Sequence, residues 1–568
     1  MNKIQPSKLK INSKFRIPIL IFVLFFAAFW RLYQLTQVPP SPSLDEASLG
    51  WNAYSILETG RDEYGYPLPI LLRAYDDWRP AGYVYLIIPF VKILGLNVLA
   101  VRLPAAIIGT LTVLLTYYLV NELFINELGK NNELFNSLTR NKLIALTASF
   151  FLAISPWHIY ISRLGHEVNL SHFFAVLGIY LFLKYQNLKE NFFLFGSAFC
   201  FALSFYSYQS SKIFVPLLVL FLVFIYKNQA IKDFRNFIVA GLLGMVILIP
   251  TLKAFFTPEG MARFQGTSLL AHSSEVFRQA ATRVADDYQR GDYLGLIFDN
   301  RRVAAVLTIL RAYFSHFDLS WLFFNSGREP HKIPNFGLFP LWFAPLFLAG
   351  IYHLIAGPYP WQKKLVLAAW FLLAPMGASL TTDAPHAMRS FNILPAPQII
   401  AGMGTVFLWE KISKNWRKKV QLIFGLFLVF HLFNLFHQYF INFPREQSDS
   451  FQYSLKMAIG YAVANENNFQ KIIITNQNAG YQSYMFYLFY SKYSPKTYLN
   501  DGGTISGGYL ETHRIGKYEF RPIEWAKDKN EKNVLLIGNI GDFPSGLNDV
   551  KEFNLLNNQK SLVAVEVK

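Results

Sequence analysis

Two adjacent carboxylates, Asp45 and Glu46, follow the first hydrophobic stretch of the chain, within Pro-Pro-Ser-Pro-Ser-Leu-Asp-Glu-Ala-Ser. A carboxylate near a membrane surface can act as a general base on an acceptor hydroxyl or amine. Adjacent like charges disfavour each other, so we expect only one of the pair to point into a shared cleft. The plainer alternative is that both side chains are solvated in an outer loop.

Four further polar clusters lie at the ends of predicted hydrophobic spans. They are Asp76 to Arg79, Arg163 with His166 and Glu167, Tyr208 with Lys212, and Asp383 with His386 and Arg389. Arginine and histidine next to a helix N-terminus form a site suited to a phosphate. Each cluster alone has an ordinary explanation, because charged side chains at span ends extend to the headgroups. Arg163 and Glu167, one helical turn apart, would then form a plain ion pair.

The composition is that of a polytopic membrane protein with soluble parts. Of the 568 residues, 53% are hydrophobic and 16% are charged, whereas a soluble globular protein carries about 25% charge. The formal net charge is +17, but the basic residues cluster in short loops between apolar stretches. That distribution indicates membrane topology and contact with anionic lipids, and argues against nucleic acid. The single cysteine, Cys200, excludes a disulfide framework and a cysteine metal site.

The hydrophobic pattern predicts about 11 transmembrane helices, since each span needs roughly 20 mostly apolar residues. They fall near residues 17–35, 99–124, 143–161, 170–186, 191–208, 211–226, 236–255, 337–356, 365–380, 391–409 and 420–440. Basic residues from Lys3 to Arg16 precede the first span, so we expect a cytoplasmic N-terminus. No small-residue cleavage site follows that span, which favours an uncleaved anchor over a signal peptide.

Residues 81–96 are apolar but are broken by Pro89 and Lys92. We expect an interfacial helix there, because a spanning helix would place the basic loop containing Lys130 and Arg140 outside. With this threading, a membrane-embedded domain covers residues 1–440. Its long outer loops are residues 37–98 and 257–336, and all five polar clusters lie on the outer face.

Residues 441–568 no longer show the membrane pattern. Three short apolar runs there read as buried strands, at Lys471–Thr475, Asn533–Ile537 and Leu562–Glu566. A helical stretch, Ser450 to Ala464, precedes the first of them. We therefore expect a small C-terminal α/β domain outside the membrane.

The polar clusters on one membrane face suggest a surface reaction. A lipid-linked phosphosugar would bring its sugar to that face with its tail in the bilayer, which predicts glycosyl transfer from a polyprenyl-phosphate donor. No Asp-x-Asp motif in a Rossmann-like unit and no glycine-rich phosphate loop points to a nucleotide sugar. A transporter or flippase for a lipid-linked glycan would place ionisable residues near the bilayer midplane instead. A non-catalytic receptor or assembly factor would leave the shared side of the clusters unexplained.

The order of the motifs resembles the GT-C membrane glycosyltransferases, in the family 39-like branch of protein O-mannosyltransferases and lipid A aminoarabinose transferases. Four passages carry the resemblance: Leu44 to Gly50 with Tyr54 and Gly60; Trp78 to Tyr85 followed by Ala100 to Pro104; Ser155 to Arg163 with Glu167; and Pro385 to Arg389 with Leu394-Pro395. They extend over most of the membrane part. Each is weak alone, whereas their order and shared side are specific.

The resemblance implies a role for each candidate residue. Asp45 would be the catalytic base, assisted by Glu46, with Glu167 as the second acidic residue, where Asp is more frequent. Arg79, His386 and Arg389 would bind the donor phosphate, and Arg163, His166, Tyr208 and Lys212 would line the cavity.

The resemblance also implies an inverting hexosyl- or pentosyltransferase in the cytoplasmic membrane, with its active site and C-terminal domain on the outer side. The acceptor class stays open between protein, lipid and envelope glycan. A divalent cation, Mg or Mn, also stays open, because some members of this superfamily need one and others do not.

Overall fold

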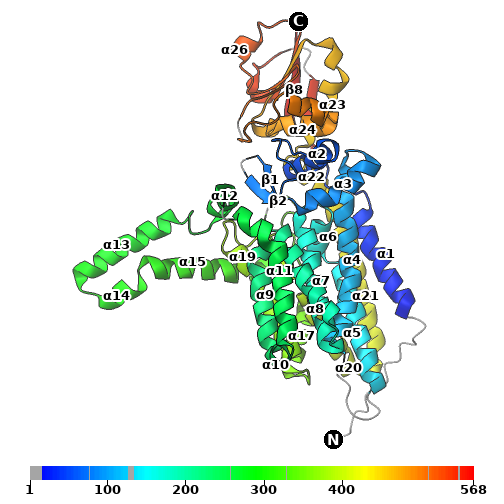
Figure 1. Ribbon diagram of the computed structural model, residues 1–568. Helices are drawn as coiled ribbons and strands as arrows, with labels where there is room; N and C mark the ends of the chain where they lie inside the picture. The colour runs from blue at the N-terminus through cyan, green and yellow to red at the C-terminus, as the bar shows by residue number, and fades with distance from the viewer. Residues whose placement is uncertain are drawn as a thin grey trace.

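The computed structural model describes residues 16–75, 77–125, 134–255, 257–327, 329–508, 511–547 and 551–568. A long helical bundle carries a mixed β-sheet at one end, here called the sheet end (Figure 1). The basic segment from Lys3 to Lys14, Asp76 and Lys130 lie outside the described residues.

The bundle consists of apolar helices that overlap each of the predicted spans. They are α1 (Arg16–Leu32), α4 (Val98–Phe124), α5 (Leu134–Ala153), α6 (Pro156–Ser162), α7 (Glu167–Leu188), α8 (Asn191–Ser207), α9 (Ser211–Ile225), α11 (Phe234–Phe255), α17 (Phe343–Ala356), α18 (Trp361–Leu373), α19 (Met376–Ser379), α20 (Ala396–Lys411) and α21 (Lys414–His437). Glycines allow a close contact between α17 and α20. A Cβ on Gly350 would lie 1.9 Å from the Ile400 carbonyl oxygen, and one on Gly404 would lie 1.9 Å from that of Leu346.

In the described part of the chain, five helices are long and apolar enough to cross a bilayer. Residues Arg140–Ala153 and Pro156–Ser162 form a bent pair, at 59°, that could make a sixth span. Most of the other expected spans fall on shorter apolar helices. The protein is therefore a membrane protein, while the count of about 11 spans and the direction of insertion stay predictions.

The first outer loop folds over the sheet end of the bundle. It contains α2 (Leu44–Thr59), the antiparallel hairpin β1 (Leu71–Ala74) and β2 (Asp77–Pro80), and α3 (Gly82–Leu94). Helix α3 packs beside α2 and buries Tyr83, Val84 and Ile87. The second outer loop contains α12 (Pro258–Thr267), α13 (Ser274–Arg290), α14 (Tyr293–Phe298), α15 (Arg301–Ser315) and α16 (Leu319–Phe323).

The C-terminal region forms a six-stranded sheet in the order β4-β5-β3-β6-β8-β7. Its strands are β3 (Lys471–Ile474), β4 (His513–Ile515), β5 (Tyr518–Phe520), β6 (Val534–Asn539), β7 (Lys551–Asn554) and β8 (Lys560–Val567). The helices of this region are α22 (Phe443–Glu446), α23 (Tyr453–Ala464), α24 (Ser483–Ser491), α25 (Pro495–Asn500) and α26 (Trp525–Asp528). All three strands expected from the sequence are present, and β3 pairs in parallel with β5 and β6.

The first outer loop and the C-terminal region share one hydrophobic core, so residues 441–568 do not pack independently. Trp51 of α2 contacts the ring of Tyr498 edge to face at 5.2 Å. Beside it, the buried carboxylate of Glu63 accepts hydrogen bonds from Tyr484 Oη at 3.1 Å and Thr504 Oγ1 at 3.0 Å. Burial raises the pKa of Glu63 to about 7. The junction between the two segments therefore contains a titrating group.

Candidate active site

Asp45 lies in the first turn of α2, where Ser43 caps the helix. Its Oδ1 accepts a hydrogen bond of 2.6 Å from Nη2 of Arg79. Arg79 reaches this point because the β1–β2 hairpin places it opposite Leu72, next to the start of α2. The Asp45 side chain is 41% exposed, whereas that of Arg79 is 4% exposed. The pair thus joins an accessible carboxylate to a buried cation.

Arg79 contacts the Asp45 carboxylate and also lies in the field of Glu167. Burial by itself would lower the pKa of its guanidinium, but the charges of Asp45 and Glu167 raise that pKa above the ordinary value. Its Nε and Nη1 atoms are buried and lack a hydrogen-bond partner among the described residues. Buried donors normally have a partner, so this guanidinium retains capacity for an anion or for water.

His166 lies between Asp45 and Glu167. It caps α7, and its Nδ1 accepts a 3.3 Å hydrogen bond from the backbone N–H of Val168. Its Nε2 lies 3.7 Å from Asp45 Oδ2. The carboxylate of Glu167 is buried, with Oε2 at 3.3 Å from His166 Nδ1. The structure therefore gathers Asp45, Arg79, His166 and Glu167 in one place.

Glu46 faces away from this group. Its carboxylate is buried and binds Arg102, with Oε1 at 2.7 Å from Nε and Oε2 at 2.9 Å from Nη2. The backbone N–H groups of Ser43 and Gly165 also donate to it. All of these contacts are internal and anchor α2 to α4, while a role for Glu46 in catalysis stays a prediction.

Arg163 has an anchoring position as well. Its guanidinium is buried and donates to the carbonyl oxygens of Trp30, Gln34 and Val38. These three carbonyl oxygens, rather than the Glu167 carboxylate, are the partners of the guanidinium, and its place in the cavity lining stays a prediction. The residue ties the end of α1 to α6.

Tyr208 and Lys212 lie at the turn between α8 and α9. The ring of Tyr208 is buried and contacts the ring of His166 edge to face, with centroids 5.9 Å apart. Tyr208 thus adjoins the Asp45 group. The backbone N–H of Lys212 closes the turn by donating to Gln209.

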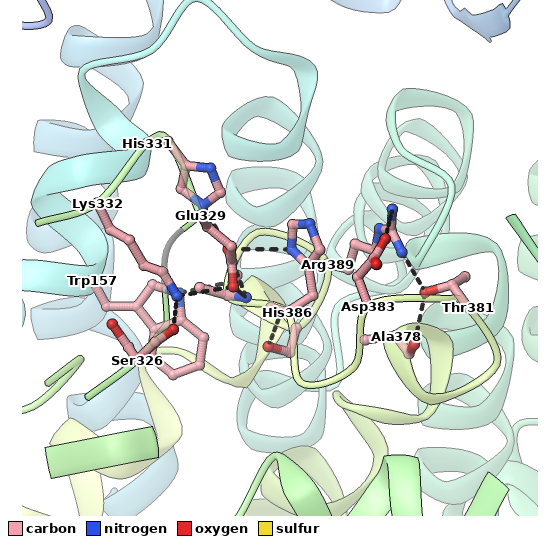
Figure 2. A network of polar contacts seen from close by, with 12 residues as sticks. Trp157, Ser326, Glu329, His331, Lys332, Ala378, Thr381, Asp383, His386 and Arg389 are labelled. Atoms are coloured by element: carbon pink, nitrogen blue, oxygen red, sulfur yellow. Dashed lines mark hydrogen bonds and ion pairs between the residues drawn. The ribbon is translucent and has the colours of Figure 1, made fainter. Parts of the chain in front are cut away.

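A second polar group surrounds Glu329, a residue that the sequence analysis did not single out. Figure 2 shows its carboxylate between Lys332, His331 and His386. Glu329 Oε1 lies 2.9 Å from Lys332 Nζ, and Oε2 lies 2.9 Å from His331 Nε2 and 3.4 Å from His386 Nδ1. The backbone N–H of Ala387 also donates to Glu329. The signal was present in the sequence, as an acid, a histidine and a lysine within four residues of a polar loop.

The charge of Glu329 is balanced mainly by Lys332. Burial lowers the pKa of His386 to about 3, so its imidazole is neutral at neutral pH. Burial by itself would raise the pKa of Glu329, but the hydrogen bond from His331 and the neighbouring positive charges hold that pKa well below its usual value. A role for His386 in binding phosphate stays a prediction, and as a neutral imidazole it would act through a hydrogen bond.

Arg389 points away from Glu329 (Figure 2). Its Nη1 donates to Thr381 Oγ1 at 2.9 Å and to the Thr382 carbonyl oxygen at 2.5 Å, and Nη2 lies 4.0 Å from Asp383. The side chain is 23% exposed. These contacts fix a partly accessible cation at the loop before α20.

Helix α12 lies between the two groups. It contacts β2, which contains Arg79. Directly after α12, Ser268 pairs with Thr381, and the N–H of Thr382 donates to the carbonyl oxygen of Thr267. The Arg79 and Arg389 segments are thus joined through one helix.

Two apolar cavities lie elsewhere. One of about 720 Å³ lies between the loop before α17 and helix α21, and one of about 520 Å³ lies between α8, α9 and α11. None of the candidate residues lines either of them. The candidate site is therefore identified from the polar contacts between its side chains and not from either of these two cavities.

In the described ranges, no group of three or more His, Cys, Asp or Glu side chains is arranged to hold a metal ion. The oxygens of Asp45 and the nitrogen of His166 come near each other, but Arg79 already neutralises Asp45. The residues thus do not fit the divalent cation that the resemblance left open.

The fold has counterparts among solved structures. ArnT from Cupriavidus metallidurans, solved with bound undecaprenyl phosphate, matches over 97% of both chains with a TM-score of 0.54 and 11% sequence identity. The chain has the GT-C fold. The GT-C fold is what the motif order indicated. At 11% identity the match concerns the fold alone.

The oligosaccharyltransferase AglB from Archaeoglobus fulgidus also matches this GT-C chain. The AglB structure with an inhibitory peptide and a dolichol-phosphate matches with a TM-score of 0.47 and 12% sequence identity. The AglB structure with a tethered acceptor peptide matches with a TM-score of 0.48 and 13% sequence identity. Each match covers 84% of this chain and 63% of AglB, so the chain spans less than two thirds of AglB. No protein-family model and no curated protein matches the sequence.

Proposed function

We propose that this protein transfers a sugar from a polyprenyl-phosphate donor to an acceptor at the outer face of the cytoplasmic membrane. The observation that supports this most is the ion pair between accessible Asp45 and buried Arg79, with His166 and Glu167 beside it. Transfer from a phosphate-linked sugar needs a base that takes the acceptor proton and a cation that binds the leaving phosphate. Asp45 and Arg79 are of these two types. The GT-C fold is compatible with this chemistry.

In the proposed reaction, the acceptor O–H or N–H attacks the anomeric carbon, and Asp45 takes its proton. The bond between that carbon and the phosphate oxygen breaks, with inversion, and polyprenyl phosphate leaves with the bonding electrons. Arg79 and Arg389 stabilise the charge that grows on the phosphate. His166 orients Asp45, and the negative charge of Glu167 stabilises the Arg79 guanidinium.

The roles of the remaining candidates follow from their contacts. His386 keeps the loop containing Arg389 in place through Glu329, while Tyr208 and Lys212 border the site.

The deciding experiment measures transfer and translocation separately in purified protein reconstituted in liposomes. Wild-type protein should move radiolabelled sugar from the polyprenyl-phosphate donor to an acceptor fraction from the cell envelope, and Asp45→Asn should not. If a fluorescent lipid-linked sugar crossed the bilayer without transfer, and Asp45→Asn left that flux unchanged, the protein would be a flippase and the proposal would fail.

A further inference from the structure

The second outer loop forms a helical hairpin that projects sideways from the bundle. Helices α13 and α15 run alongside each other, joined by the short helix α14 (Figure 1). The hairpin is attached at the C-terminal end of α15, where α15 packs on α19 and Tyr313 Oη donates to the Leu372 carbonyl oxygen at 2.8 Å. The tip, α14, lies far from the bundle.

Helix α13 covers only one face of α15. The guanidinium of Arg301 lies 4.5 Å from the ring centroid of Phe277, and Arg283 pairs with Asp299 at 3.4 Å. The outer face of α13 is polar and contains the ion pairs Glu275–Arg278 and Asp286–Arg290. The outer face of α13 is therefore suited to contact with water.

The opposite side of the hairpin is apolar and exposed. On α15, Val306, Leu310 and Phe314 follow one another at intervals of one helical turn, and on α14 Leu294 and Phe298 do the same. The exposed large apolar side chains of this face are Tyr293, Leu294, Ile297, Phe298, Val306, Leu307, Leu310 and Phe314, with exposed fractions from 42% to 79%. So large a patch on a water-soluble surface would be unusual.

Cations border this apolar face. Arg302 and Arg311 are exposed and, at roughly 100° per residue, flank the stripe of Val306, Leu310 and Phe314 on either side. Helix α15 contains three arginines and no acidic residue. An apolar stripe between arginines is typical of a helix that lies in the plane of a bilayer surface.

The position of the hairpin in Figure 1 also indicates contact with the bilayer surface. Helices α14 and α15 lie on the side toward the membrane-spanning helices, and α13 lies on the side toward the sheet end. The apolar face is thus continuous with the lipid-exposed bundle. We propose that α14 and α15 lie in the interfacial layer of the membrane, with their apolar face among the acyl chains and their arginines on anionic phospholipid headgroups.

A depth measurement on the full chain tests this proposal. In a Cys200→Ser background, an environment-sensitive fluorophore is attached at Leu310→Cys on α15 or, as a matched control, at exposed Gln289→Cys on α13. The protein is placed in nanodiscs of phosphatidylcholine and phosphatidylglycerol. The label at 310 should be quenched by brominated acyl chains and spared by aqueous iodide, and the label at 289 should behave in the opposite way.

Equal iodide quenching at both positions would overturn the proposal, because the hairpin would then lie in water. Protection from both quenchers at 310, together with cross-linking between two copies, would overturn it in favour of a protein partner. In the Arg302→Gln, Arg311→Gln double variant, quenching by brominated lipid at 310 should decrease. If that decrease were the same in discs of phosphatidylcholine alone, the assignment of the arginines to anionic headgroups would be wrong.

Discussion

Asp45 and Glu46 are neighbours in the chain, yet their carboxylates bind different arginines: Asp45 binds Arg79 at an accessible site, and Glu46 binds Arg102 in the interior. Successive residues of a helix point about 100° apart, so one turn of α2 can present one acid to the candidate site and another to α4. The two arginines thus give the adjacent acids different surroundings, an accessible ion pair for Asp45 and a buried one for Glu46.

Asp45→Asn should remove activity without unfolding the protein. A general base contributes about 10²- to 10⁴-fold to rate, so the turnover number should fall by that order while the thermal midpoint in detergent stays close to wild type. Retained sugar transfer would exclude Asp45 as the base.

Glu46→Gln should lower the stability of the protein, in contrast to Asp45→Asn, which should lower its turnover. It leaves the buried Arg102 without its counter-charge, and breaking a buried pair costs about 3–5 kcal/mol. We expect a clear loss of thermal stability and of folded yield. A variant of wild-type stability with reduced turnover would instead return Glu46 to the catalytic group.

Arg389→Ala should weaken use of the donor. A hydrogen bond to a charged group contributes about 1.5–3 kcal/mol, so the Michaelis constant for the polyprenyl-phosphate donor should rise about 10-fold or more, with a smaller change for the acceptor. Arg389→Lys serves as the control that keeps the charge and loses the two contacts to Thr381 and Thr382. Unchanged donor kinetics in the alanine variant would exclude a phosphate role.

Glu329→Gln should loosen the loop that contains His386 and Arg389, because it leaves buried Lys332 unbalanced. Protease cleavage within residues 325–390 should become faster, as read by mass spectrometry of the fragments. Adding Lys332→Met should slow cleavage again, since replacing both charges is far less costly than removing one. If the single variant were cut no faster than wild type, the ion pair would contribute nothing to the loop.

The junction between the first outer loop and the C-terminal region should weaken as pH rises. The pKa of Glu63 is about 7 in the folded protein, above its ordinary value, so the folded state binds more protons. Its contribution to stability is fully present below pH 4.5 and is lost as the pH rises through about 7. Thermal unfolding of wild type should therefore show a falling midpoint between pH 5 and pH 8, and Glu63→Gln should flatten that slope. Equal slopes in both proteins would exclude Glu63 as the titrating group.

The sequence by itself determined the membrane character, the positions of the apolar helices and the three strands of the C-terminal sheet. These features depend on hydrophobic runs and on local order along the chain, which a single sequence records directly. The sequence also singled out Asp45, Arg79, His166 and Glu167, because they lie in the polar segments that separate apolar stretches.

Only the tertiary structure decided which of these polar residues face one another. From the sequence, Glu46 and Arg163 are as plausible site residues as their neighbours. In the structure Glu46 is buried against Arg102, and Arg163 is buried against carbonyl groups at the end of α1. His386 likewise meets Glu329, whose position depends on how the second outer loop folds back. The reason is physical: burial and pairing set the charge and reach of an ionisable group, and both depend on contacts between segments that sequence spacing does not specify.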